Sequence, residues 1–365
     1  MTLSNQTKNS LGRRTALSAG ILIVFAALLL LLSFWLRRPV SRNLSGELFR
    51  LNGGATPCYD DAGNGLAVAT STGIHLFSGR GKCVAEAEVA LLSPACSACA
   101  SCGVYYDVGA TGFWLLHPDG KVEYHPTDDA VTYAHVNEEG MLVVLTEGSE
   151  YKGHMYVYDS DGQALFRWDR GSGYPLTGRL SADGLLCVNC VTASGSVLRF
   201  FRTDVQEELF SYSAPGELIV DFGFLSDGTI AAVLEDRLVF LRDNGEERFS
   251  YSFSGQYLTA FSIDGPYAIA ATSASLTGEN ASLFVLNSHG RVLGTLDTEH
   301  TVLSLSTRED RLLILFEDEA TLYTAEMKEI VSVQNTLDEK QVFLCPDGTA
   351  ILAGTEGARL VDFGQ

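Results

Sequence analysis

The sequence lacks the residue groupings that are typical of catalysis or of nucleotide binding. No glycine-rich phosphate loop occurs, and the seven histidines are dispersed at positions that fit neither a metal site nor a catalytic triad. The turn Asp159-Ser-Asp-Gly-Gln163 lacks the remaining oxygen ligands of a calcium loop. The sequence therefore predicts no catalytic residue and no cofactor, and it favours a binding protein over an enzyme.

Positive charge is scarce beyond the first 42 residues. The 365 residues carry a net charge of −20, and residues 1–42 contain six basic side chains and no acidic one. The remainder is therefore six units more negative than the whole chain, at −26. Such a domain repels nucleic acid and anionic lipid headgroups, so no nucleic-acid partner is expected.

Residues 16–36 form the one long stretch without a charge. As a helix, these 21 residues are roughly 31 Å long, which matches the hydrocarbon thickness of a bilayer. The stretch continues directly into Arg37 and Arg38 without the small-residue cleavage site of a signal peptide. It predicts an uncleaved transmembrane helix at 16–36, with a basic tail at 1–15, a linker at 37–43 and one domain at 44–365. A cleaved signal peptide is the alternative.

Three basic residues flank each side of this stretch, so charge alone does not set its orientation. A short basic tail stays inside easily, and a large acidic domain can cross a membrane whatever its charge. The eight cysteines fit an oxidising exterior. We expect a single-pass protein of the cell membrane with a cytoplasmic N-terminus and an extracytoplasmic domain.

Residues 218–252 show how the domain is built. Four short apolar runs, at 218–225, 229–234, 238–242 and 248–252, are separated by Ser-Asp-Gly, Glu-Asp and Asp-Asn-Gly. Val, Ile, Leu, Phe and Tyr favour strands, and the Asp-Gly and Asn-Gly turns suit tight hairpins. The segment therefore predicts a small antiparallel sheet of four strands.

Turns like the first one of this sheet recur along the chain at intervals of 37 to 45 residues. The positions are Gly65, Gly103, Gly140, Gly184, Gly228, Gly265, Asp310 and Gly348. This period is expected for four strands and their turns in one blade of a propeller. The sequence predicts an all-β protein, a β-propeller of four-stranded antiparallel blades. Eight blades are favoured, and seven follow if the irregular repeat at 90–119 is misread. A pair of β-sandwiches is the other fold considered.

The last repeat offers three strands, at 341–345, 350–354 and 358–363, before the chain ends. Gly-Glu-Leu-Phe-Arg-Leu at 46–51 resembles the fourth strands at 163–168 and 207–212. We predict that 46–51 supplies the missing strand, because closing the ring removes open sheet edges that invite aggregation.

The strand order gives the ring two faces. The turn face carries the connections from first to second and from third to fourth strands, and these are tight. The loop face carries the other connections, with longer segments at 126–130, 146–153, 169–176, 273–281 and 296–300. Binding tends to use such loops. The candidate partner-binding residues there are Glu150, Tyr151, Arg170, Tyr174, Tyr257 and His300.

The cysteines are the other local feature. Cys96, Cys99 and Cys102 have two CxxC spacings and are weak metal candidates without a fourth ligand nearby. Cys187 and Cys190 fall on a predicted strand, where positions three apart point to opposite faces. Cys58 and Cys345 lie near the ends of first strands on either side of the ring closure, so they are a suggestive pair. The sequence does not determine which cysteines pair in disulfides.

From about residue 44 to 363 the repeats resemble WD40-like and quinoprotein-like propellers. Gly153-His154 and Trp168-Asp169 each occur once, and a regular tryptophan docking pattern is absent, so no quinone cofactor is expected. One membrane helix followed by such a ring resembles an uncharacterised family of single-spanning propeller proteins of Gram-positive bacteria. The resemblance implies a surface propeller of unknown function.

Three functions are compatible with this plan. The leading hypothesis is a membrane-anchored, non-enzymatic scaffold that binds a protein or a cell-envelope polymer through the loop face. The alternatives are an envelope hydrolase or lyase and a redox or metal sensor that uses the cysteines. Carboxylates with shifted pKa values converging at the ring axis would favour the enzyme.

Overall fold

The computed structural model describes residues 46–50, 57–63, 65–148, 150–170, 173–335 and 339–363. The chain divides into two compact units, residues 1–41 and 42–365, and the described residues belong to the second. Within the described residues, no helix is long and apolar enough to cross a membrane. The predicted tail, transmembrane helix and linker lie outside the described residues.

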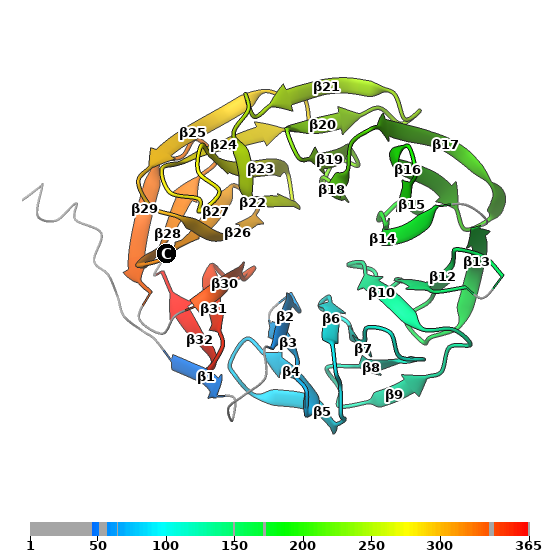
Figure 1. The fold of residues 1–365 in the computed structure, drawn as a ribbon. Coiled ribbons are helices and arrows are strands. Elements are labelled where there is room, and N and C mark those ends of the chain that lie inside the picture. The colour runs from blue at the N-terminus through cyan, green and yellow to red at the C-terminus, as the bar shows by residue number, and fades with distance from the viewer. Residues whose placement is uncertain are drawn as a thin grey trace, which may run out of the picture. The chain divides into compact units, whose positions relative to one another are not determined.

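The second unit consists of eight antiparallel sheets of four strands each, arranged as blades around a central channel (Figure 1). In each blade the first strand lies innermost and the fourth lies at the rim. The first four blades are β2 (Cys58–Asp61), β3 (Gly65–Ala69), β4 (Gly73–Ser78) and β5 (Cys83–Glu88); β6 (Pro94–Ala98), β7 (Gly103–Asp107), β8 (Phe113–Leu116) and β9 (Val122–His125); β10 (Val131–Val136), β11 (Leu142–Thr146), β12 (Gly153–Tyr158) and β13 (Ala164–Arg170); and β14 (Tyr174–Leu180), β15 (Leu185–Thr192), β16 (Gly195–Arg202) and β17 (Val205–Pro215).

The remaining blades follow the same order. They are β18 (Ile219–Phe224), β19 (Ile230–Leu234), β20 (Arg237–Leu241) and β21 (Glu247–Ser252); β22 (Tyr257–Asp264), β23 (Tyr267–Ser273), β24 (Ala281–Asn287) and β25 (Val292–Thr298); β26 (Val302–Arg308), β27 (Arg311–Phe316), β28 (Glu319–Thr324) and β29 (Glu329–Gln334); and β30 (Glu339–Leu344), β31 (Thr349–Gly354) and β32 (Gly357–Asp362), completed by β1 (Gly46–Arg50).

The predicted eight-bladed propeller is confirmed, and the seven-bladed and double-sandwich alternatives are wrong. The irregular repeat forms a complete blade, β6 to β9, with short strands. In the segment that first indicated the repeat, β18 to β21 match the four predicted runs to within one residue.

The predicted closure of the ring is also confirmed. β1 pairs antiparallel with β32, from Gly46 opposite Leu360 to Arg50 opposite Gly357. The Phe49 ring then stacks on Phe77 of the first blade, with ring centroids 4.3 Å apart. The last blade is therefore built from strands at both ends of the domain. Its N-terminal strand β1 also contacts the first blade.

Burial explains why the second strands read as continuous apolar runs. Every residue of β3, β7, β11 and β19 is buried, because neighbouring blades cover both faces of these strands. Apolar clusters fill the spaces between blades, as where Leu313 and Leu322 of one blade meet Val342 and Leu352 of the next. The core is thus a ring of interfaces between blades.

The predicted loop boundaries need correction. Loops at 146–153 and 273–281 are confirmed, but the predicted loop at 169–176 is mostly strand. β13 runs to Arg170 and β14 begins at Tyr174, because Asp169 pairs with His154 and Tyr174 pairs with Val191. Likewise, β25 extends to Thr298 and shortens the loop expected at 296–300. Some loop-face connections are tight as well, such as the two residues between β15 and β16.

Candidate functional site

Exposed apolar side chains gather on the loop face. The structure describes fourteen large apolar residues as exposed, and nine of them lie in loop-face connections or among the first three residues of an inner strand. The nine are Leu92, Val108, Tyr151, Tyr174, Leu176, Leu218, Val220, Tyr257 and Leu276. The other five lie on outermost strands, and none lies in a described turn of the turn face. The exposed apolar residues therefore lie mainly on one of the two faces of the ring.

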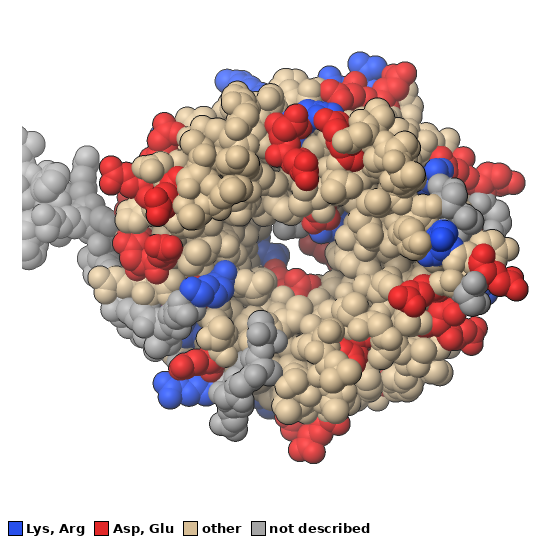
Figure 2. Space-filling view, viewed as in Figure 1, with Lys and Arg blue, Asp and Glu red and all other residues tan. Residues whose placement is uncertain are grey.

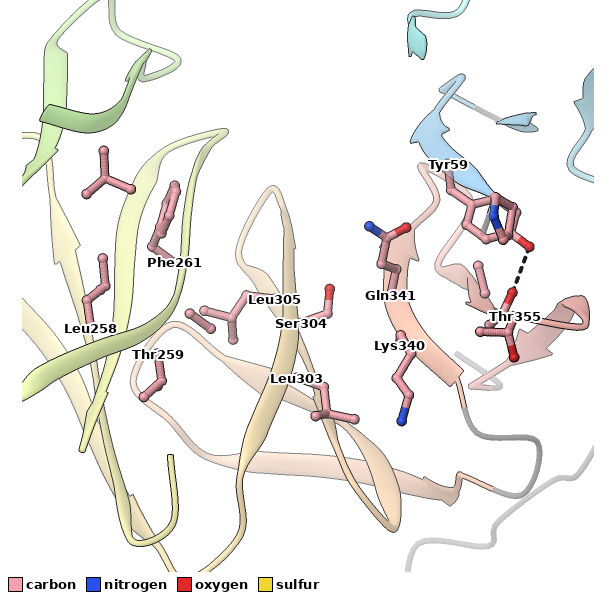
Figure 3. A pocket seen from close by; sticks show the side chains of 15 residues that line it. Tyr59, Leu258, Thr259, Phe261, Leu303, Ser304, Leu305, Lys340, Gln341 and Thr355 are labelled. Atoms are coloured by element: carbon pink, nitrogen blue, oxygen red, sulfur yellow. Dashed lines mark hydrogen bonds between the residues drawn. The ribbon is translucent and has the colours of Figure 1, made fainter. Parts of the chain in front are cut away.

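A pocket of about 600 Å³ opens in the central channel near the loop face (Figure 3). Its walls come from the inner strands β2, β18, β22, β26 and β30, with the end of β31 and neighbouring residues. The apolar and aromatic lining side chains include Tyr59, Val220, Leu258, Phe261, Leu303 and Leu305. Strands that lie far apart in the sequence thus form one concave site.

The polar groups of the pocket are few. Ser304 and Gln341 extend between the two walls, Thr355 lies near Tyr59, and Lys340 is the one charged side chain among the described lining residues (Figure 3). The Tyr59 hydroxyl donates a hydrogen bond of 2.8 Å to the Gly354 carbonyl and fixes that wall. The described lining contains no carboxylate, although the domain is strongly acidic. The pocket suits an apolar ligand with a few hydrogen-bonding groups.

Ion pairs join inner strands elsewhere along the channel. Arg308 places Nη2 2.6 Å from Asp61 Oδ2 and donates through Nε to the Leu344 carbonyl at 2.9 Å. Arg308 thereby reaches across the last blade to the first. Arg179 Nη2 lies 2.8 Å from Asp221 Oδ2. Figure 2 shows side chains of both charges inside the central opening, while the surface around it is mostly uncharged.

Among the groups on the inner strands whose pKa values are strongly shifted are one carboxyl and one imidazole. Burial raises the pKa of Asp60 to about 7, although the Ala98 amide donates a hydrogen bond of 2.7 Å to its Oδ2. Burial, with the positive charge of Arg179, lowers the pKa of His135 to about 3, so this imidazole is neutral at physiological pH. Neither residue lines the pocket.

The structure brings together only some of the predicted partner-binding residues. Glu150 and Tyr151 lie in the connection between β11 and β12, and Arg170 ends β13. Tyr174 begins β14, and its hydroxyl accepts a hydrogen bond of 3.1 Å from Lys152 Nζ. These four residues therefore occupy one sector of the loop face. Tyr257, at the start of β22, and His300, between β25 and β26, lie in a separate sector.

The sequence analysis missed the environment of His154, which lies next to Tyr151. Its Nδ1 is 2.6 Å from Asp169 Oδ1, and its Nε2 is 3.5 Å from Asp129 Oδ2. Tyr151 covers the imidazole edge-on, with ring centroids 5.6 Å apart. The Gly-His and Trp-Asp dipeptides thus face each other across β12 and β13. Their pairing could be found only by aligning the two strands.

The three weak metal candidates, Cys96, Cys99 and Cys102, do not all lie within metal-ligand distance of one another. Cys96 Sγ lies 3.7 Å from Cys58 Sγ on the neighbouring blade, whereas Cys99 and Cys102 flank the turn between β6 and β7. The thiol near Cys58 is therefore Cys96 and not the suggested Cys345. The hydrogen bond from Cys96 lowers the pKa of Cys58 to about 7. All eight cysteines are free thiols.

Cys187 and Cys190 behave as predicted for positions three apart on a strand. Both lie on β15 and are buried, but Cys187 packs with Phe222 toward the following blade. Cys190 packs with Leu145 toward the preceding blade. This pair therefore cannot hold one metal ion.

Eight four-stranded blades around a channel with an apolar pocket define the protein as a β-propeller. The chain belongs to the family of unknown function DUF5711, whose family model matches residues 50–351. A search of curated protein sequences gives no match.

Among solved structures, the chain is similar to the C-terminal WD40 domain of Sif2, with 10% identity and a TM-score of 0.64 over 87% of this chain and 98% of that one. It is also similar to BamB from Moraxella catarrhalis, with 12% identity and a TM-score of 0.57 over 87% and 97% of the two chains. A third similar structure is apo AztD from Citrobacter koseri, at 10% identity and a TM-score of 0.54 over 78% and 87%. At these identities the likeness concerns the fold alone.

Proposed function

We propose that this protein is a single-pass membrane protein whose propeller lies outside the cytoplasm and binds a protein partner, without catalysis, through the loop face. The observation that supports this most strongly is the concentration of exposed apolar side chains on that face. Aromatic side chains such as Tyr151, Tyr174 and Tyr257 are enriched in the cores of protein interfaces. The proposal therefore rests on the exposed side chains of the loop face and not on the propeller fold.

The direction of β1 supports the orientation that we propose for the ring. As a fourth strand, β1 begins at the turn face and runs toward the loop face. Residues 37–44, about eight in number, span at most roughly 28 Å when extended. With the anchor at 16–36, this short linker would hold the turn face near the bilayer. The loop face then points away from the membrane of a Gram-positive cell.

The pocket favours binding over hydrolysis. General acid–base catalysis needs a titratable group within hydrogen-bond reach of the substrate. The described lining holds no carboxylate, histidine or cysteine, and Asp60 lies outside it. Its titratable side chains are Lys340 and Tyr59, and the Tyr59 hydroxyl is engaged with the Gly354 carbonyl. A mainly apolar pocket with one lysine, one side-chain amide and several hydroxyl groups is instead suited to seating a side chain or terminus of a partner.

The test compares two sets of variants of the full-length protein, solubilised in detergent, for capture of envelope proteins. Changes at Glu150, Tyr151, Arg170 and Tyr174 should weaken capture without lowering the melting temperature, because exposed residues bury little apolar area. The matched set is Asp119→Ala and Asn244→Ala on the turn face. Both side chains accept a backbone hydrogen bond in their turns, at 2.9 and 3.0 Å, so this set should lower stability slightly and leave capture intact.

The proposal fails if only the turn-face set loses the partner. If the loop face captured an envelope polymer in place of a protein, the assignment of the binding face would stand and the class of partner would be wrong.

A further inference from the structure

Three side chains of the first blade bring different metal-ligand atoms together. His75 lies on β4, and Cys83 and Glu86 lie on β5. His75 Nδ1 is 3.5 Å from Glu86 Oε2, and Cys83 Sγ is 3.6 Å from the same oxygen. All three ligand atoms lie within 4.8 Å of one another, and this is the one such group among the described histidine, cysteine, aspartate and glutamate residues.

A β-bulge creates this arrangement. His75 pairs directly with Glu86, so the two side chains share a face of the sheet. On a regular strand Cys83 and Glu86, three positions apart, would point to opposite faces. The register shifts between Leu76 and Phe77, so that Phe77 pairs with Cys83 and the extra residue Val84 turns the thiol toward the glutamate. The sequence analysis missed the group because the bulge cannot be read from residue spacing.

The distances suit a tetrahedral ion. With zinc bonds of about 2.0 Å to nitrogen and oxygen and about 2.3 Å to sulfur, ligand atoms lie about 3.3 Å (N to O) and about 3.5 Å (S to O) apart. The observed separations of 3.5 and 3.6 Å are close to these values. Two of the three separations thus match a tetrahedral ion, and the third, from His75 Nδ1 to Cys83 Sγ, is within 4.8 Å.

The surroundings are fixed on one side and open on the other. The His75 carbonyl accepts a hydrogen bond of 2.8 Å from the Tyr105 hydroxyl of the next blade. The Cys83 thiol also contacts the Ala85 carbonyl at 3.4 Å. His75 and Cys83 are half-buried, whereas the Glu86 side chain is 69% exposed. Solvent or a partner can thus reach the fourth position.

We propose that His75, Cys83 and Glu86 form a binding site for a divalent transition-metal ion, with zinc as the best fit. One imidazole, one thiolate and one carboxylate match the ligand preferences of zinc, and a fourth position open to water is typical of sites that act on a further ligand. On binding, the metal takes the place of the thiol proton, which passes to solvent. The site lies on the outer strands of the first blade and is independent of the loop-face proposal.

Cobalt(II) is the probe, because a cobalt–thiolate bond gives a charge-transfer band in the near ultraviolet that nitrogen and oxygen ligands do not give. The full-length protein in detergent, titrated with Co²⁺ under anaerobic conditions, should develop this band at one equivalent together with the visible bands of a tetrahedral ion. One equivalent of Zn²⁺ should abolish them.

Variants assign the ligands. Cys83→Ser should remove the charge-transfer band, and His75→Ala and Glu86→Gln should weaken cobalt binding at least tenfold. Cys96→Ser is the matched control, because Cys96 belongs to the sequence-predicted thiol group, and it should leave the band unchanged. Melting temperatures without metal, compared with that of the unchanged protein, verify that each variant folds.

The proposal is overturned if no thiolate band develops. It is also overturned if the band survives in folded Cys83→Ser protein or disappears in folded Cys96→Ser protein. In those cases the three side chains form only a cross-strand polar cluster.

Discussion

Asp60 on the inner strand β2 couples stability to pH. Burial raises the pKa of this carboxyl to about 7 in the folded protein, above the ordinary value of 3.8 that the unfolded chain retains. Between these two values the folded state holds a proton that the unfolded state releases. Stability therefore falls as the pH rises through this window, by up to about 1.4 kcal/mol per pH unit.

We predict that Asp60→Asn removes this slope and raises the melting temperature at pH 8, since the asparagine is never ionised. Melting curves at pH 5 and pH 8 measure the effect. Asp161→Asn, a change at an exposed turn residue, is the control and should preserve the slope. If the unchanged protein and Asp60→Asn lost stability in parallel between the two pH values, the half-buried Asp60 carboxyl would not be the cause.

Arg359 and Glu339 form a buried ion pair in the last blade. Arg359 is 6% exposed and Glu339 is 2% exposed. The arginine donates through Nε to Glu339 Oε1 at 2.5 Å and through Nη2 to the Gln334 carbonyl at 2.6 Å. Truncating the arginine would leave a charged carboxylate in the core without this partner.

We expect Arg359→Ala to lower the free energy of unfolding by about 3–5 kcal/mol. Arg242→Ala is the matched control. It breaks a pair with Glu246 whose side chains are 55% and 65% exposed, so its cost should stay below about 1 kcal/mol. Denaturant unfolding of both variants measures the difference, and equal costs would show that the pair in the last blade is not protected from solvent.

Single residues divide sharply into those that the sequence identified and those that it missed. Tyr151, Tyr174 and Tyr257 were predicted as accessible, and they are 41%, 55% and 48% exposed. Their neighbours could not be predicted. The pairing of His154 with Asp169 depends on strand register, and the approach of Cys83 to Glu86 depends on a bulge. Both arise from backbone pairing, which residue spacing does not encode.

Strand β1 is the element whose role can be tested most directly. Among the described strands, only β1 pairs with the outer edge of β32, and an uncovered strand edge invites aggregation. We predict that removal of residues 1–52 lowers the melting temperature and promotes aggregation, compared with removal of residues 1–42. Equal melting temperatures for the two truncated proteins would refute the closure.

Gly357 offers a single-residue test of the same closure. A Cβ at Gly357 would lie 2.2 Å from the Phe49 carbonyl oxygen of β1. Gly357→Ala should therefore cost more stability in the protein that retains β1 than in the protein that lacks residues 1–52. Gly195→Ala is the control, because its Cβ would lie 2.2 Å from the Ala214 carbonyl within an intact blade. Gly195→Ala should lower stability by the same amount in both proteins. If Gly357→Ala also lowered stability equally in the two proteins, the role of β1 would be contradicted.

Elements were predicted well where composition and turns agree. β18 to β21 combine continuous apolar runs with Asp-Gly and Asn-Gly turns, and their predicted ends are off by at most one residue. The loop predicted at 169–176 is mostly strand, because backbone pairing continues up to Arg170 and resumes at Tyr174. Tertiary pairing overrides composition at such strand ends.

At the scale of the whole molecule, the repeat period predicted the ring, and the resemblance of 46–51 to the fourth strands predicted its closure. It could not predict the pocket, because the lining residues come from five blades whose spacing in the sequence says nothing about the shape of the channel. The ion pair from Arg308 to Asp61 joins residues 247 positions apart, and sequence spacing could not predict it either.

The proposed orientation makes a separate prediction for cells. Protease added to intact cells from which the wall has been removed should digest the propeller, because the proposed orientation puts the domain outside the cytoplasm. An epitope placed before residue 8 should stay protected until the cells are lysed. Digestion of the propeller only after lysis would show that the orientation is reversed.

The central claim is that the loop face meets the partner, and site-specific photo-crosslinking in cells tests it most directly. A photoreactive residue placed at Tyr174, Tyr257 or Leu276 should crosslink the protein to one and the same partner. Placed at Asp119 or Asn244 on the turn face, at equal expression, it should give no such product. Crosslinks from the turn-face positions alone would contradict the account.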